Sequence, residues 1–191
     1  MFQEAGSALQ IDIEELFEVS VHDVKKYPYL EKTFSYRNEK YFESGRNAIE
    51  YIFKYCIDSK NKKVLLPEYL CTSISDAVTR AGWNFQFYKI DKRLKIQEDD
   101  LLNKIKNNSV LFVIDYFGKN QSFEFLEKIK RIYPEIIIIE DCTQSLLSER
   151  NETDIVDYLI ASIRKWFPIP SGGGVWSHHT LPDIQLTKGG Q

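Results

Sequence analysis

The sequence predicts an α/β fold in which a largely parallel sheet is covered by helices on both faces. Residues 110–114 and 136–139 are apolar and rich in β-branched side chains, without polar alternation. Such runs are typical of strands buried on both faces. Segments with apolar residues at helical spacing separate the strand-like segments, and strands that alternate with helices in this way build parallel sheets through helical crossovers.

The first half of the chain is expected to form two helices and two strands. Residues 46–55 place apolar side chains on one helical face. A second helix, 73–81, ends before Gly82, a residue suited to the C-terminal end of a helix. The strands are 64–67, which a proline stops, and 85–90.

The second half is expected to continue this alternation and to end on two strands. The expected helices are 98–106 and 123–132, and the expected strands are 110–114, 136–139, 158–163 and 174–177. Residues 1–42 are acidic and aromatic without a regular repeat. We expect them to form an N-terminal arm that packs on the body that follows.

Composition favours a soluble cytoplasmic protein that binds neither nucleic acid nor membrane. The 191 residues, 43% of them hydrophobic, suffice to bury a core. The net charge is −3 and the basic residues are spread along the chain, unlike a nucleic-acid patch. Three cysteines without a CxxC pair indicate neither a disulfide framework nor a metal site. The N-terminus lacks a signal-peptide pattern, and no apolar run approaches the roughly 20 residues of a membrane helix.

Three segments that follow predicted strands are expected to meet at one edge of the sheet. They are residues 67–73, 115–118 and 141–145. Ligands of parallel sheets bind beyond the carboxyl ends of the strands. This edge is therefore the expected binding site.

Asp141 and Lys165 are the two side chains in this sequence that most clearly suggest chemistry. Asp141 follows four isoleucines and Glu140, and Lys165 lies among Ile163, Trp166 and Phe167. The apolar surroundings of Lys165 favour a neutral, reactive amine. A carboxylate and an amine suit pyridoxal 5′-phosphate (PLP), whose ring nitrogen takes an acidic partner and whose aldehyde takes a lysine. The alternative for Asp141 is a helix cap or a structural ion pair. The alternative for Lys165 is an ordinary strand-end lysine whose amine reaches into water.

A phosphate site is expected where the helix 46–55 begins. Gly45 permits close approach of the backbone, the helix start offers unpaired N–H groups, and Arg46 and Asn47 add donors. An ordinary helix cap with a surface arginine is the alternative. Ser162 and Arg164 would lie near the same phosphate if the chain before Lys165 resembles a Ser-x-x-Lys arrangement.

Three further side chains are candidates for contact with the cofactor ring. Gln144 follows Asp141 by three residues and could reach the phenolic oxygen, although a solvent-facing amide is the alternative. Tyr69 and Cys71 lie on the loop where a ring-stacking side chain would be placed. Tyr69 is chemically the better stacking group, with a core tyrosine as its alternative.

These motifs, taken in order, resemble the N-terminal part of the DegT-type nucleotide-sugar aminotransferases, which are fold-type I PLP enzymes. The resemblance covers roughly residues 42–177, and its motifs are 44–49, 66–73, 81–82, 115–118, 139–145, 162–165 and 172–173. It implies a three-layer α/β/α large domain with a mostly parallel sheet, here residues 43–191, and a homodimer. It also implies glutamate as the amino donor and a nucleotide-linked keto sugar as the acceptor.

The resemblance also implies roles for individual residues. Lys165 would be the Schiff-base lysine, Asp141 the partner of the ring nitrogen, and Gln144 a neighbour of the phenolic oxygen. The phosphate would lie against Gly45, Arg46 and Ser162.

The sequence departs from the family pattern at several points. Arg46 replaces a small hydroxyl residue, Cys71 replaces the usual stacking aromatic, and Ile160 stands where a serine is usual. The family is about twice as long, so we expect the 191 residues to lack its C-terminal small domain. The alternative is therefore a truncated or degenerate, non-catalytic domain that serves binding or dimerisation. A PLP-dependent sugar dehydratase is a further rival, but such relatives lack the lysine.

Overall fold

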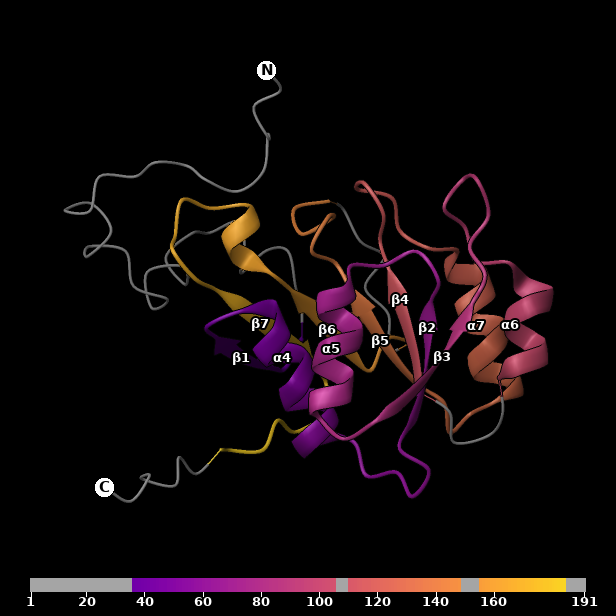
Figure 1. The fold of residues 1–191 in the computed structure, drawn as a ribbon, viewed down its shortest axis with the longest axis horizontal. Helices are drawn as coiled ribbons and strands as arrows, with labels where there is room; N and C mark the ends of the chain where they lie inside the picture. The colour runs from indigo at the N-terminus through magenta and orange to yellow at the C-terminus, as the bar shows by residue number, and fades with distance from the viewer. Residues whose placement is uncertain (1–35, 106–109, 149–154, 185–191) are drawn as a thin grey trace.

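One seven-stranded mixed sheet organises the computed structural model, which describes residues 36–105, 110–148 and 155–184. Its strand order is β1-β7-β6-β5-β4-β2-β3 (Figure 1). The strands are β1 (Asn38–Phe42), β2 (Lys63–Pro67), β3 (Asn84–Tyr88), β4 (Val110–Ile114), β5 (Ile137–Asp141), β6 (Tyr158–Ala161) and β7 (Gly173–Ser177).

Five neighbouring strands are parallel to one another, as the sequence predicts: β6, β5, β4, β2 and β3, in that spatial order. In this register Ile114 lies beside Asp141, and Asp141 lies beside Ile160. The carboxyl ends of the parallel strands therefore share one edge. β7 and β1 are antiparallel additions, and Phe42 pairs with Gly173 at that same edge.

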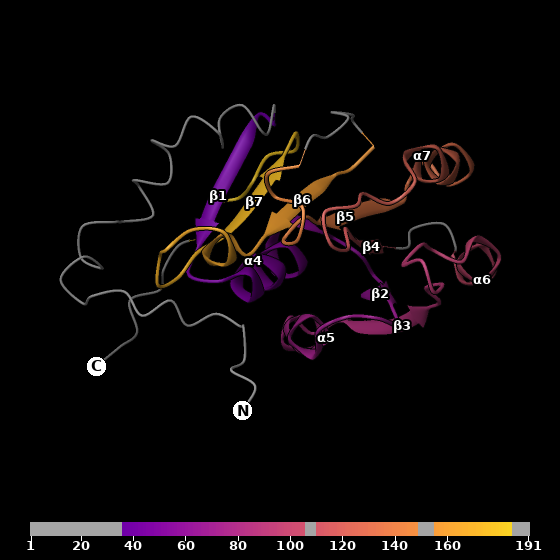
Figure 2. The ribbon, with the colours of Figure 1, turned by 90° about the horizontal axis from the view of Figure 1, so that it is seen from above.

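Helices cover both faces of the sheet, which gives three layers. Figure 2 shows α4 (Gly45–Tyr51) and α5 (Thr72–Arg80) on one face, with α6 (Glu98–Lys104) and α7 (Phe123–Ile132) on the other. The predicted three-layer α/β/α architecture with a mostly parallel sheet is confirmed.

Local sequence explains where the helices begin and end. Ser44 caps α4 by accepting a hydrogen bond from the backbone N–H of Asn47, and Ser122 caps α7 in the same way. Gly82, with a φ of 81°, follows α5 in the left-handed conformation that glycine adopts without a steric penalty. α4 continues directly into a π-helical segment, Ile52–Cys56, so the two together fill the predicted helix.

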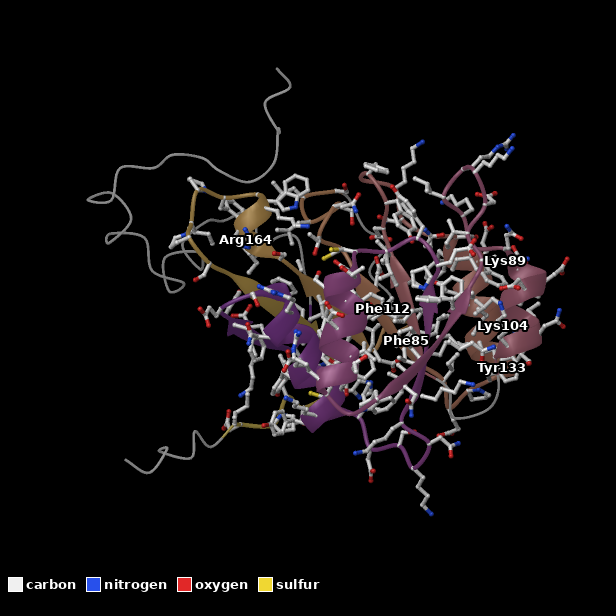
Figure 3. All side chains as sticks on the ribbon, viewed as in Figure 1. Phe85, Lys89, Lys104, Phe112, Tyr133 and Arg164 are labelled. Atoms are coloured by element: carbon white, nitrogen blue, oxygen red, sulfur yellow. The ribbon has the colours of Figure 1, made fainter. Side chains whose placement is uncertain are left out.

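Large apolar side chains of the central strands form the core. All five residues of β4 are buried, and Phe112, at its centre, is fully buried (Figure 3). Tyr88 donates a hydrogen bond from its buried hydroxyl to the carbonyl of Phe112, which ties β3 to β4 across β2. No helix in the described part of the chain combines the length and the apolar character that crossing a bilayer requires.

One sequence expectation is corrected by the sheet. Residues 38–42 were expected to belong to the N-terminal arm, yet they form the edge strand β1. Strand β1 pairs with β7 over five residues, from Asn38 beside Ser177 to Phe42 beside Gly173. The rest of the expected arm, residues 1–35, lies outside the described residues.

Candidate active site

The carboxyl edge of the parallel strands holds a cavity of about 630 Å³. The three loops expected to meet there do so, and the start of α4 and the segment after β6 complete the walls. The lining residues are Ser44, Gly45, Arg46, Ile49, Tyr69, Leu70, Cys71, Ser73, Ile74, Ile114, Tyr116, Phe117, Asp141, Thr143, Gln144, Ile160, Ser162, Arg164 and Lys165.

Asp141 brings a buried carboxylate into this cavity. It is the last residue of β5, only 8% exposed, and its Oδ1 accepts a 2.8 Å hydrogen bond from the backbone N–H of Thr143. The side chain of Thr143 hydrogen-bonds the same carboxyl group. Burial raises the pKa of Asp141, against the opposing effects of the Thr143 hydrogen bond and the Lys165 charge.

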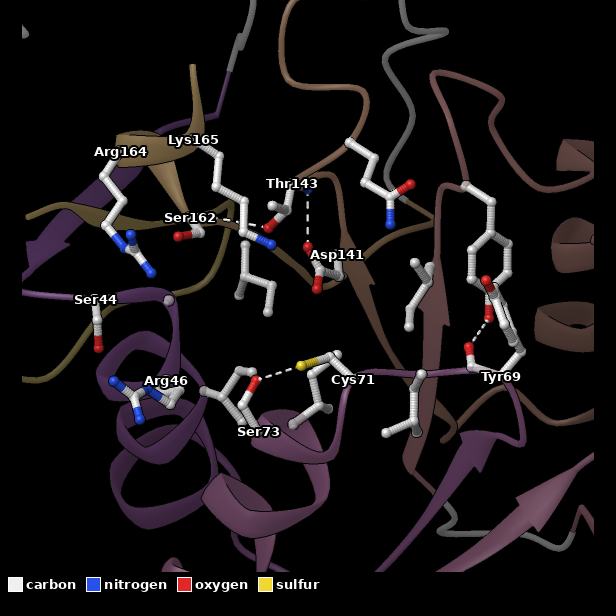
Figure 4. A pocket seen from close by; sticks show the side chains of 18 of the residues that line it. Ser44, Arg46, Tyr69, Cys71, Ser73, Asp141, Thr143, Ser162, Arg164 and Lys165 are labelled. Atoms are coloured by element: carbon white, nitrogen blue, oxygen red, sulfur yellow. Dashed lines mark hydrogen bonds between the residues drawn. The ribbon is translucent and has the colours of Figure 1, made fainter. Parts of the chain in front are cut away.

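Lys165 faces Asp141 within the same cavity (Figure 4). It ends the 3-10 turn Ile163–Lys165, which follows β6, and its backbone N–H donates to the carbonyl of Ser162. The sequence suggested that bulky apolar neighbours would desolvate this lysine. That expectation is wrong for the structure described, because Lys165 is exposed and Trp166 is 39% exposed.

Thr143 connects the two segments that carry Asp141 and Lys165. Besides donating to Asp141, it accepts the backbone N–H of Ser162 on its Oγ1, at 2.9 Å. Its carbonyl accepts the indole N–H of Trp166, at 2.5 Å. The sequence placed Thr143 within the motif 139–145 but indicated no role for it. Its position two residues after a strand-ending aspartate is the turn signal that could have identified it.

Two arginines and two serines gather at one end of the cavity. Arg46 and Arg164 lie there with Ser44 and Ser162 (Figure 4). This end combines positive charge with hydroxyl donors, the groups that bind phosphate. The predicted neighbours Gly45, Arg46 and Ser162 are thus brought together.

Close approach of the backbone makes this arrangement possible. A Cβ on Gly45 would lie 3.2 Å from the Cβ of Ser162, and one on Gly173 would lie 2.3 Å from the carbonyl carbon of Ser44. Gly173 therefore lets β7 pass directly beneath the start of α4. The sequence showed these glycines without indicating what each one contacts.

Asn47 does not line the cavity, unlike the other predicted phosphate contacts. Its backbone N–H and its side-chain oxygen both engage Ser44, the cap of α4. The structure thus gives Asn47 the ordinary capping arrangement that was the alternative interpretation of this helix start.

The predicted ring contacts all reach the cavity. Tyr69 is 55% exposed, and its ring centroid lies 5.6 Å from that of Tyr116. Cys71 is exposed and precedes α5, and its sulfur accepts a hydrogen bond from Ser73. Gln144 is exposed and accepts the backbone N–H of Phe117 on its Oε1, which leaves its NH₂ group as the end that can donate to a ligand.

Two residues of the predicted segment 115–118 support the site, although the sequence indicated an individual role for neither of them. Tyr116 donates from its hydroxyl to the carbonyl of Tyr69, and so joins the loops after β2 and β4. The buried Asp115 accepts a 2.7 Å hydrogen bond from the hydroxyl of Ser145. Asp115 directly follows β4, as a strand-end carboxylate, and that position was the available signal.

Solved structures of aminotransferases share this fold, although no family model and no curated protein sequence matches the chain. PseC of Helicobacter pylori, an aminotransferase involved in the biosynthesis of pseudoaminic acid, superposes with a TM-score of 0.71 at 16% identity, over 87% of this chain and 48% of its own. NtdA of Bacillus subtilis, with bound cofactor PMP, gives 0.67 at 16% identity, over 88% and 42%. A sugar aminotransferase from Micromonospora echinospora gives 0.62 at 15% identity, over 80% and 47%.

The chain spans less than half the length of these proteins. Sequence identities of 15–16% are too low to indicate substrate or activity, but TM-scores above 0.6 establish the shared architecture. The chain therefore has the α/β/α fold of these solved aminotransferase structures.

Proposed function

We propose that this chain is the cofactor-binding large domain of a PLP-dependent aminotransferase that acts on keto sugars linked to a nucleotide. The observation that carries the proposal is the meeting of Asp141 and Lys165 in one cavity that has two arginines at one end. A ring nitrogen, an aldehyde and a phosphate are the three functional groups that such a set of side chains can hold at once.

The residues of the cavity fit PLP. The carboxylate of Asp141 is buried and is hydrogen-bonded by Thr143, so a ring N–H at Oδ2 would offset part of its desolvation. The cavity volume of about 630 Å³ lies within the usual range of small-molecule sites, about 300–1,000 Å³. Arg46, Arg164 and Ser162 would hold the phosphate.

When bound, PLP supplies an electron sink and an aldehyde that exchanges amines. Asp141 would keep the ring nitrogen protonated, which strengthens that sink. The amine of Lys165 would attach the aldehyde and, once released, would move a proton at the reacting carbon. Gln144 would donate its NH₂ group toward the phenolic oxygen, and Tyr69 and Cys71 would line the walls beside the ring.

The substrates are proposed from the resemblance and from the structural neighbours. The structural neighbours include a sugar aminotransferase and an aminotransferase of pseudoaminic acid biosynthesis, which supports a keto sugar as the amino acceptor. Glutamate is proposed as the donor from the family resemblance. We also propose that the protein is a cytoplasmic homodimer, as the family resemblance implies.

The test is a titration of the purified chain with PLP, followed by borohydride. We expect a visible absorbance band that borohydride bleaches, and a mass increase of one phosphopyridoxyl group on Lys165. Lys165→Ala should abolish both signals. Lys128→Ala is the matched control, because Lys128 is an exposed lysine on α7 outside the cavity.

Two outcomes would contradict this proposal. A band that persists in Lys165→Ala would assign the amine to another lysine. A wild-type chain that forms no band would instead favour the alternative function, a non-catalytic domain that serves binding or dimerisation.

A further inference from the structure

We propose that the hydroxyl of Thr143 is the positioning group that holds the Lys165 turn against the end of β5. This inference rests on the proposed function, because it takes Lys165 as the lysine that attaches the cofactor. It adds a residue that touches neither the aldehyde nor the ring nitrogen and that acts through Lys165.

The contacts of Thr143 bracket the turn that carries Lys165. Its Oγ1 accepts the N–H of Ser162, which directly precedes the turn, and its carbonyl accepts the indole N–H of Trp166, which directly follows it. Its own N–H donates to Asp141. One buried residue thus fixes both ends of a three-residue turn relative to the carboxylate opposite (Figure 4).

The turn needs such an external hold because it has few bonds of its own. A 3-10 turn has poorer hydrogen-bond geometry than an α-helix. This one contains the bonds from Lys165 to Ser162 and from Trp166 to Ile163, of 3.2 and 2.9 Å. Without the Thr143 hydroxyl, the Ser162 N–H would lose its acceptor in a half-buried position, a costly state for a backbone donor.

The hydroxyl of Thr143 accepts the Ser162 N–H and also hydrogen-bonds the carboxyl group of Asp141. The N–H bond to Asp141 and the bond from Trp166 use the backbone of Thr143, so any residue at this position keeps them. Thr143→Val therefore removes the hydroxyl and both of its contacts at nearly constant shape. Thr143→Ser keeps the hydroxyl and removes a methyl group. The two variants separate positioning from packing.

The first measurement is the rate of reductive trapping of PLP at Lys165, followed by peptide mass spectrometry. We expect Thr143→Val to lower this rate about tenfold, because an amine held in the wrong place reacts slowly. Thr143→Ser should stay within about twofold of wild type. Trapping at exposed Lys128 serves as the internal reference and should not change.

The second measurement needs no cofactor. Amide hydrogen exchange of Ser162 should be about tenfold faster in Thr143→Val and unchanged in Thr143→Ser. If Thr143 acted only on the stability of the fold, both variants would lower the unfolding midpoint. The faster amide exchange would then extend through β5 and β6. Positioning predicts that the change is confined to residues 162–166.

The two measurements distinguish failure of this inference from failure of the proposed function. If PLP is not trapped at Lys165 of the wild type at all, the proposed function fails. The positioning role toward the cofactor then fails with it, whatever the amide exchange of Ser162 shows. If Lys165 is trapped equally well in wild type and Thr143→Val, or if Thr143→Ser is as impaired as Thr143→Val, the hydroxyl does not position the turn.

Discussion

Asp141 and Lys165 line one cavity although 23 residues separate them in the chain, and the positive charge of Lys165 acts on the Asp141 carboxylate. The relationship follows from the sheet. β5 and β6 are parallel neighbours in which Asp141 pairs with Ile160, so the residues that follow β6 emerge beside the end of β5. The lysine opposes, without removing, the effect of burial on the carboxyl group, whose pKa remains raised.

Replacing Asp141 by Asn should stabilise the chain without ligand while it weakens cofactor binding. A buried carboxylate with a raised pKa is unfavourable when ionised, whereas the Asn side chain can still accept the Thr143 N–H. We expect a gain on the order of 1 kcal/mol at neutral pH, or about 2–4 °C in thermal midpoint. Asp58→Asn, on an exposed loop, is the control.

The same variant gives a pH dependence of known sign. Because the pKa of Asp141 is higher in the folded state, its contribution to the free energy of unfolding is fully present below the unfolded pKa and is lost as the pH rises through the folded pKa. Wild type and Asp141→Asn should have similar stability near pH 3, and the variant should gain from about pH 4 upward. A difference in stability that does not change with pH would contradict this account.

The cationic end of the cavity can be tested with a pair of ligands that differ only in the phosphate. Arg46→Gln and Arg164→Gln should each weaken binding of pyridoxal phosphate by roughly tenfold, because each removes a charge-assisted contact. Binding of pyridoxal should change little. Arg131→Gln, an exposed arginine on α7, is the control. Equal losses for the two ligands would mean that the arginines act on the fold rather than on the phosphate.

The central part of the fold was predictable because its signals are local. Apolar runs such as 110–114, with helices between them, specify a covered parallel sheet, and the common edge of that sheet brings Asp141 and the loops near Tyr69 and Tyr116 together. Strand β1 was not predictable in the same way. It mixes charged and aromatic residues at the sheet edge, and it pairs with β7, which lies more than 130 residues later.

The site could be predicted by residue type but not by environment. Asp141 is buried as expected, whereas Lys165 is exposed, and the indole N–H of the neighbouring Trp166 bonds to the carbonyl of Thr143. Asn47 engages its own helix cap instead of the cavity. These outcomes depend on side-chain partners from distant segments, which no local pattern in the sequence reveals.

Gly173 should tolerate no side chain. A Cβ there would lie 2.3 Å from the carbonyl carbon and oxygen of Ser44 and 2.6 Å from the backbone nitrogen of Gly45. We expect Gly173→Ala to lower the free energy of unfolding by about 3 kcal/mol or more, because backbone must move to relieve the overlap. Pyridoxal phosphate binding should fall as well, because the displaced segment leads into Arg46.

Gly82→Ala is the matched comparison for this glycine. An added Cβ meets nothing within 4 Å there, so only the left-handed φ of 81° is penalised. The expected loss is about 1 kcal/mol. Losses of equal size at the two positions would contradict the steric explanation for Gly173.

Cys71 should be the cysteine that alkylates first. The hydrogen bond from Ser73 lowers the pKa of the exposed Cys71 thiol, and the charge of Lys165 adds to the effect. Burial instead raises the pKa of Cys56 to about 11, and Cys142 is buried, with its thiol donating a hydrogen bond to the carbonyl of Ile160. Because the thiolate is the nucleophile, limiting iodoacetamide at neutral pH should label Cys71 several-fold faster than either other cysteine.

Peptide mass spectrometry measures this order directly, and two changes should slow the labelling of Cys71. Ser73→Ala removes the main cause of the lowered pKa, so the rate should fall roughly threefold at neutral pH and recover in alkaline buffer. Prior addition of pyridoxal phosphate should protect Cys71 if the ring occupies the cavity that this sulfur lines. Labelling that begins at Cys56 would place the accessible thiol outside the cavity. Protection that survives Lys165→Ala would show that the ring is held by contacts other than that amine.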